Sequence, residues 1–164
     1  PEMPDAAGLM SRRFLRIGEE HTLREALAVL FNSEHTLELT QTLVALHGDG
    51  SVAGVLDARQ ILRKLMIQPP DPVLGDGHAR FHADMALARE HLDAKVSEAM
   101  AADVPLVSPD DPLPVLIRKF TGQSVASLPV VSEGRVVGVL HLSAVFGSAV
   151  SLALDPNSDG IKAP

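Results

Sequence analysis

Residues 127–140 combine two short apolar runs with a turn between them. The first run is Ser127-Leu128-Pro129-Val130-Val131, the second is Val136-Val137-Gly138-Val139-Leu140, and Glu133-Gly134 lies between them. Branched aliphatic residues favour strands, and a glycine beside a polar residue favours a tight turn. The pattern predicts a β-hairpin made of residues 128–131 and 135–140.

An earlier part of the chain repeats this pattern. Gly54-Val55-Leu56 matches Gly138-Val139-Leu140 at a spacing of 84 residues, and residues 43–46 and 52–56 flank a turn at Gly48-Asp49-Gly50. Apolar positions of a preceding helix also match, at a spacing of 90 residues. The matched pairs are Met10 with Met100, Leu23 with Leu113, Ala26 with Leu116, Leu27 with Ile117 and Leu30 with Phe120. Matches at constant spacing indicate an internal duplication.

Each copy is predicted to be a strand, a helix, a hairpin and a second helix. The first strands are expected at residues 13–17 and 104–107. Thr22 and Glu25 form a T-x-x-E capping box before the first helix of copy one, whereas in copy two Asp111 is the expected cap and Pro112 the first helical residue. The second helices are expected to gather their apolar residues on one side: Ile61, Leu62, Leu65 and Met66 in copy one, and Val145, Phe146, Ala149 and Val150 in copy two.

The fold class is therefore α/β (α+β), a duplicated βαββα unit with pseudo-two-fold symmetry. Copy one is assigned to residues 9–67 and copy two to residues 96–152. Residues 68–95 form a linker. The run Pro69-Pro70-Asp71-Pro72 at its start ends the preceding helix, and residues 83–92 are expected to be helical. Residues 153–164 are expected to be a disordered tail.

Composition excludes several classes of function. The net charge is −7 and aromatic residues make up 3% of the chain, so nucleic-acid binding by stacking on a basic face is not expected. There is no cysteine, which removes disulfides, thiolate metal sites and a cysteine nucleophile. Residues 136–154 carry no formal charge, but glycine, serine and histidine interrupt them, so no membrane insertion of this segment is expected. The chain starts at Pro1 rather than at methionine, which is consistent with a fragment of a larger protein.

The run from Ser127 to Leu140, with Met100 before it and Asp111-Pro112-Leu113 at the helix start, resembles the core of a cystathionine-β-synthase (CBS) domain. Copy one is a looser match to the same family. The resemblance implies a Bateman module, which is a tandem CBS pair that binds AMP, ATP or S-adenosylmethionine in clefts between its copies. It further implies a cytoplasmic homodimer that regulates an attached or associated enzyme or transporter.

The resemblance also places ligand contacts. Nucleotide-binding members carry G-h-x-[ST]-x-x-D where the last strand meets the last helix, with the hydroxyl near phosphate and the carboxylate on ribose. Copy one instead has Asp57 and Gln60 at these two positions, and copy two has His141 and Ala144. Asp57 is expected to cap its helix and to repel a phosphate, and His141 is expected either to bond a ligand or to be a satisfied structural histidine. The other positions implied by the resemblance are Phe14, Leu15, Arg59, Val104, Pro105, Ala126 and Ser127.

Two further hypotheses are a metal site and an active site. Asp76, His78, His82 and Asp84 have the composition of a metal site, but they lie in the linker, where exposed histidines are usually only solvated. The chain contains no G-x-S-x-G, H-E-x-x-H, P-loop or G-x-G-x-x-G motif. The prediction is a non-catalytic, ligand-sensing regulatory module. The alternative is a degenerate pair that serves for dimerisation or docking, including as the cytosolic part of an ion channel or transporter.

Overall fold

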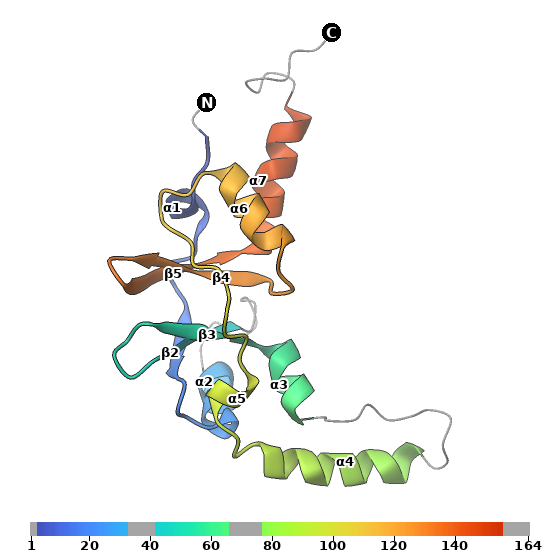
Figure 1. Cartoon of the computed structure of the whole chain (residues 1–164). Coiled ribbons are helices and arrows are strands. Elements are labelled where there is room, and N and C mark those ends of the chain that lie inside the picture. Colours follow the sequence, from blue (N-terminus) through green and yellow to red (C-terminus); the bar gives the residue numbers. More distant parts are fainter. Residues whose placement is uncertain (1–2, 33–41, 66–76, 156–164) are drawn as a thin grey trace. The chain divides into compact units, whose positions relative to one another are not determined.

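The computed structural model describes residues 3–32, 42–65 and 77–155, which belong to two compact units (Figure 1). The copy-one unit is made of residues 15–102, and the copy-two unit is made of residues 1–14 together with residues 103–164. The second unit is therefore discontinuous in sequence, because the segment before copy one packs with copy two. The fold is mixed α and β, as predicted.

The copy-one unit is built on a three-stranded sheet. Strands β1 (Leu15–Gly18), β2 (Thr42–Leu46) and β3 (Val52–Asp57) lie in the order β1-β2-β3. Strand β1 is parallel to β2, with Leu15 opposite Leu43, and β2 is antiparallel to β3, with Thr42 opposite Asp57. The helices of this unit are α2 (Leu23–Asn32), α3 (Ala58–Leu65), α4 (Gly77–His91) and α5 (Val96–Ala99).

Alternate residues of these strands point into a core that the helices close. The core contains nine buried residues: Ile17, Leu23, Ala26, Leu30, Leu43, Ala45, Leu56, Ile61 and Val96. The spacing of Leu23, Ala26 and Leu30 puts them on one face of α2, as the sequence predicts. Leu27 is only partly buried against this core.

The predicted capping box at the start of α2 is confirmed. The Thr22 hydroxyl accepts the Glu25 N–H at 3.2 Å, and the Glu25 carboxylate accepts the Thr22 N–H at 3.2 Å. These bonds satisfy backbone donors that the first turn of a helix leaves unpaired.

The copy-two unit is built around a hairpin. Strands β4 (Ser127–Ser132) and β5 (Arg135–His141) pair antiparallel, with Ser127 opposite His141, and the turn between them has positive φ at Glu133 (53°) and Gly134 (78°). Two successive positive φ angles give the hairpin turn whose twist matches the strands. Helices α6 (Leu113–Thr121) and α7 (Leu142–Leu154) contact each other, and α1 (Ala6–Leu9) belongs to the same unit (Figure 1).

Two predicted details of copy two are wrong. Residues 104–107 form no regular strand. Only Val107 pairs, donating its N–H to Pro129 O at 3.0 Å, since Pro105 has no N–H to continue a ladder. Pro112 is the N-cap of α6 rather than its first residue, and the Asp111 carboxylate accepts bonds from Ser108 N–H and Lys119 Nζ.

The predicted apolar side of the second helices is also partly wrong. Ile61 and Val145 are buried, but Leu62 is 57% exposed and the equivalent Phe146 is 66% exposed. Adjacent positions on a helix lie about 100° apart, and Leu62 and Phe146 fall beyond the edge of the buried face. Met66 lies outside the described residues. The linker helix is longer than expected, because α4 starts at Gly77 rather than at residue 83. Helix α7 continues to Leu154, into the predicted tail.

In each unit, a short segment from outside the repeat pairs with the last strand. Ala101 and Val55 exchange backbone bonds of 2.9 and 3.0 Å in the copy-one unit, and Ser11 and Val139 exchange bonds of 2.8 and 2.9 Å in the copy-two unit. The matched glycines Gly54 and Gly138 lie directly under these segments. A Cβ on Gly138 would be 2.8 Å from Ser11 O, and one on Gly54 would overlap the carbonyl of Ala101. The presence of a glycine at both matched positions thus has a steric reason within this chain.

Among the helices of residues 3–32, 42–65 and 77–155, none has the length and apolar character needed to cross a bilayer.

Candidate ligand sites in the two copies

Asp57 and Gln60 cap helix α3 by bonding to each other's backbone. The Asp57 Oδ1 atom accepts the N–H groups of Arg59 (2.9 Å) and Gln60 (3.1 Å), and Gln60 Oε1 accepts the Asp57 N–H at 2.6 Å. This is a reciprocal capping box with an aspartate in place of the usual serine or threonine. Asp57 therefore has the helix-capping role that the sequence predicted.

The capping box places a carboxylate where the family pattern has a hydroxyl. Two N–H groups at the start of α3, those of Arg59 and Gln60, are already bonded to that carboxylate, and its negative charge repels a second anion. The Gln60 carbonyl oxygen also accepts one bond within the box, which restricts how this side chain could meet a ribose. The start of α3 is consequently unsuited to a phosphate group.

The equivalent position of copy two has a different arrangement. His141 is the N-cap of α7 but makes no side-chain bond to the helix, and its Nδ1 lies 2.8 Å from the Ser127 hydroxyl. Ser127 is 2% exposed and is the one buried polar residue among the residues that the structure describes. Burial lowers the pKa of the His141 imidazole below its ordinary 6.5, which favours the neutral ring at pH 7. Copy two thus presents a neutral imidazole, held by a buried hydroxyl, beside an N-terminus that lacks a carboxylate.

The remaining predicted positions fall into two groups. In the copy-two unit, Val104 and Pro105 are half-buried, Ala126 is exposed beside Ser127, and Ala144 is half-buried in the first turn of α7. The carbonyl of Ala126 accepts the Leu142 N–H at 2.8 Å, which ties the start of β4 to the start of α7. In the copy-one unit, Leu15 begins β1 and Arg59 is exposed on α3, while Phe14 belongs to the copy-two unit. The structure therefore brings Ala126, Ser127, His141 and Ala144 together within one unit.

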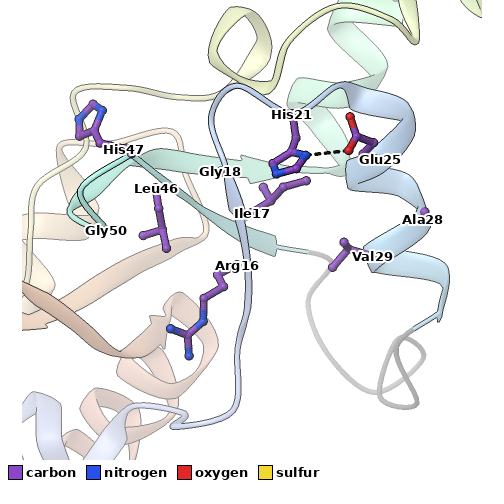
Figure 2. Close-up of a pocket in the computed structure, with 11 residues that line it drawn as sticks. Arg16, Ile17, Gly18, His21, Glu25, Ala28, Val29, Leu46, His47 and Gly50 are labelled. Atoms are coloured by element: carbon purple, nitrogen blue, oxygen red, sulfur yellow. Dashed lines mark hydrogen bonds and ion pairs between the residues drawn. The ribbon is translucent and has the colours of Figure 1, made fainter.

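The copy-one unit also contains a groove that the sequence did not predict. It has a volume of about 730 Å³ and lies along β1, one face of α2 and the β2–β3 turn (Figure 2). Its lining is mainly apolar and includes Ile17, Val29 and Leu46, with Arg16, His21 and His47 as its basic residues. None of the predicted ligand positions lines it. The signal that could have found it is the set His21, Glu25, Ala28 and Val29, which share one side of the α2 helix and of the turn before it.

Two histidine–glutamate pairs lie beside this groove. His21 Nδ1 is 2.7 Å from Glu25 Oε2, and the two side chains point toward each other in Figure 2. His47 Nδ1 bonds the Glu19 carboxylate, which joins the β2–β3 turn to the turn after β1. The hydrogen bond with His21, followed by that from the Thr22 backbone, lowers the pKa of the Glu25 carboxyl. Each ring is therefore oriented by a carboxylate through one of its nitrogens.

The predicted metal set is only partly described. Asp76 lies outside the described residues, and of His78 only the backbone, in α4, is described. Among the described parts of the chain, no group of three or more metal-ligating side chains is close enough to hold a metal ion. His82 and Asp84 lie on α4, where His82 is exposed and forms an edge contact with Phe81.

Comparison with solved structures finds the same fold in other proteins. The cytosolic domain of the Mg²⁺ channel MgtE, solved with ATP, is 23% identical with a TM-score of 0.62 over 87% of this chain and 48% of that one. A CBS-domain containing protein from Agrobacterium tumefaciens is 21% identical with a TM-score of 0.62, over 88% and 92% of the two chains. The CBS domain of a membrane protein from Sphaerobacter thermophilus is 15% identical with a TM-score of 0.66, over 88% and 87%.

This chain spans about half of the MgtE cytosolic domain. None of the curated proteins matches the sequence. The family model of the CBS domain matches twice, at residues 6–67 and 96–150, which together exceed half of the chain. Both matches agree with the two copies assigned from the sequence, and the chain therefore belongs to the CBS domain family, as a tandem pair.

Proposed function

We propose that this tandem pair is a non-catalytic regulatory module that senses an adenine-containing ligand, such as AMP, ATP or S-adenosylmethionine. The Ser127–His141 pair is the observation that carries the proposal. It puts a buried hydroxyl and a neutral imidazole at the position where the family resemblance expects ligand contacts. The hydrogen bond to the buried hydroxyl fixes the orientation of the imidazole, as a binding role at that position would require.

The two copies are proposed to differ in the ligand group that they accept. The Asp57 carboxylate disfavours phosphate at the start of α3, so a phosphate-bearing ligand binds through copy two. A neutral or cationic group, such as the sulfonium of S-adenosylmethionine, suits the surroundings of Asp57 better.

Thermal unfolding with a panel of AMP, ADP, ATP and S-adenosylmethionine, with and without Mg²⁺, tests this proposal. A ligand at 100 times its Kd stabilises the folded chain by about 2.7 kcal/mol, which raises the melting temperature by about 5–10 °C. Ala144→Glu adds a carboxylate to the first turn of α7 and should abolish the shift caused by nucleotides. Ser151→Glu, at an exposed position two turns further along α7, is the matched control and should leave the shift unchanged. Unchanged melting temperatures with every ligand would contradict the sensing function.

A second function, dimerisation or docking without a ligand, is favoured by a different observation. Leu142, Phe146, Val150 and Leu154 are spaced four residues apart on α7, and they are 44%, 66%, 37% and 77% exposed. This row, here called the α7 stripe, can pair with itself across a two-fold axis, as the interface of a homodimer requires. We propose that a second copy of the chain covers it.

The regulated partner is proposed to be an attached or associated enzyme or transporter, with the pair on the cytoplasmic side. The support is the likeness to the cytosolic domain of a Mg²⁺ channel and to a domain of a membrane protein. Co-purification with the partner chain from the native host, with and without the ligand found by thermal unfolding, tests this association.

A further inference from the structure

Helix α3 turns a cationic side away from the core of the copy-one unit. Arg59, Leu62 and Arg63 are exposed and lie three and four positions apart, on the side of the helix opposite the buried Ile61. The helix contains no acidic residue anywhere along its length. These three residues, here called the α3 patch, therefore combine two positive charges with one exposed apolar side chain.

The same side of the matching helix in copy two carries no charge. Helix α7 contains no acidic or basic residue from its first position to its last. The exposed residues that match at a spacing of 84 are Arg59 with Ser143, Leu62 with Phe146 and Arg63 with Gly147. Two helices that derive from one duplicated unit thus present chemically different surfaces to solvent.

The positive charge of α3 is not fully explained by contacts within the chain. The side chains of Arg63 and Lys64 have no hydrogen-bond or ion-pair partner in the part of the chain that the structure describes. Both lie in the last turn of the helix, where the helix dipole favours a cation, but Arg59 lies in the first turn, where the dipole disfavours one. Helix-dipole electrostatics therefore account for Arg63 and not for Arg59.

The isologous contact of a homodimer does not suit the α3 patch. Across a two-fold axis α3 would face a second α3, and because the helix has no carboxylate, arginines would meet arginines. Packing of the patch against the uncharged α7 would bury guanidinium groups without partners, which costs free energy. The α7 stripe can pair with a second copy of the chain, whereas the α3 patch requires a surface that carries carboxylates.

We propose that the α3 patch docks an acidic segment of another protein, with carboxylates against Arg59 and Arg63 and an apolar side chain on Leu62. The proposal rests on the regulatory function proposed above and names the surface that meets the regulated partner. A guanidinium can hold a carboxylate through two parallel hydrogen bonds, which gives such a contact a defined geometry. An anionic membrane also attracts arginines, but one exposed leucine offers little apolar surface for insertion into lipid, which favours a protein segment.

Methyl NMR titration of the whole chain tests the surface and its charge preference. The probes are an acetylated peptide of repeated Glu-Glu-Leu, its counterpart of repeated Lys-Lys-Leu, and phosphatidylglycerol vesicles. The acidic peptide should shift the Leu62 methyl signals, with an affinity that falls as salt is raised from about 50 to 500 mM, and the basic peptide should not. Equal shifts with both peptides, no shift with either, or binding of the vesicles alone would overturn the proposal.

Two pairs of variants separate the charge from the apolar contact. Arg63→Glu should weaken binding of the acidic peptide by about fivefold or more, because an attraction becomes a repulsion. Arg118→Glu, at an exposed arginine in the last turn of α6, makes the same charge change in the copy-two unit and should leave the affinity unchanged. Leu62→Ser should also weaken binding, whereas Leu106→Ser, at a 48% exposed leucine, should not. Equal losses within either pair would contradict the proposal.

The same variants distinguish this proposal from the regulatory function on which it rests. Arg63→Glu should lose co-purification with the native partner chain and keep the melting shifts caused by nucleotides. Retained co-purification in Arg63→Glu would contradict docking through the α3 patch. A wild type that binds the acidic peptide but co-purifies with no partner would contradict the association proposed above and would still support the acidic-segment surface.

Discussion

Asp57 and His141 stand at equivalent positions of the two copies and have opposite consequences. Asp57 turns inward on its own helix and satisfies the N–H groups of Arg59 and Gln60. His141 turns away from its helix and bonds Ser127 on the neighbouring strand. A single residue in each copy thereby makes the start of α3 anionic and leaves the start of α7 without a charge.

The His141 imidazole should make stability depend on pH. Its pKa is lowered by burial, so the folded chain binds this proton less tightly than the unfolded chain does. The stabilising effect is fully present above pH 6.5 and is lost as the pH falls from there through the lowered pKa. Urea unfolding of the wild type should show a midpoint that declines from pH 7.5 to pH 5.

His141→Gln is the comparison for this measurement, because glutamine does not titrate and can still bond Ser127. Its midpoint should decline less over the same pH interval. Parallel declines in the two proteins would assign the pH dependence to other groups.

Part of this local chemistry is readable from the sequence. The Thr22–Glu25 box could be predicted, because both partners lie within one turn of a helix. The Ser127–His141 and Glu19–His47 pairs could not be predicted. The partners of the first pair are 14 residues apart and meet through the register of a hairpin, and those of the second are 28 residues apart and meet where two turns lie together.

At the scale of elements, the last strand of each copy carries a glycine because another segment crosses it. Ala101 pairs with Val55 beside Gly54, and Ser11 pairs with Val139 beside Gly138. Backbone atoms cannot give way as the end of a flexible side chain can, so an added methyl group must displace the crossing segment.

Gly54→Ala should therefore destabilise the chain by about 2 kcal/mol or more, which lowers its melting temperature by about 4–8 °C. Gly138→Ala should act in the same direction but less strongly, because one of the atoms in its way is the flexible Met10 side chain. Gly48→Ala is the control: its Cβ would meet nothing within 4 Å, and the change should stay within about 0.5 kcal/mol. A Gly54→Ala protein as stable as Gly48→Ala would contradict the steric explanation.

Elements with a strong pattern could be predicted, and marginal ones could not. Both hairpins follow from branched residues around a glycine turn, and they agree with the structure within one or two residues. The apolar run at residues 104–107 resembles a strand by composition, yet it contributes one isolated pairing at Val107. Composition does not reveal whether a neighbouring strand has an unpaired edge opposite these residues.

At the scale of the whole molecule, helix α7 carries four of the eleven large apolar residues that are exposed in the described part of the chain, more than any other element. The α7 stripe contains a large apolar residue at every fourth position along the whole helix. Apolar surface of this length on a soluble domain usually marks an interface.

Phe146→Asp should shift the chain toward the monomer if the α7 stripe is a dimer interface. A charge in the centre of an apolar contact is desolvated without a partner, which typically costs several kcal/mol of association free energy. Sedimentation velocity at several concentrations would measure the change.

Leu106→Asp is the matched control, since Leu106 is a 48% exposed leucine of the same unit outside α7. It should leave the sedimentation coefficient unchanged. A monomeric wild type, or equal effects of both substitutions, would contradict dimerisation through this stripe.

The duplication could be predicted at this scale, but the unit with which each flanking segment packs could not. Matched residues at constant spacing define the copies, whereas residues 1–14 join the copy-two unit through backbone bonds that leave no pattern in the sequence. Leu113, for example, donates its N–H to Pro4 O at 2.9 Å, across more than a hundred residues.

Each half of this chain loses a backbone partner of its last strand when it is cut at its repeat boundary. A gene fragment that stopped at residue 95 would remove Ala101 from β3, and one that began at residue 96 would lack the strand-like partner at Ser11 and the helix α1. In each unit, the segment that pairs with the last strand comes from the residues that precede the other repeat. Recombination between genes could therefore exchange the pair as a whole, but a single repeat moved alone would arrive incomplete.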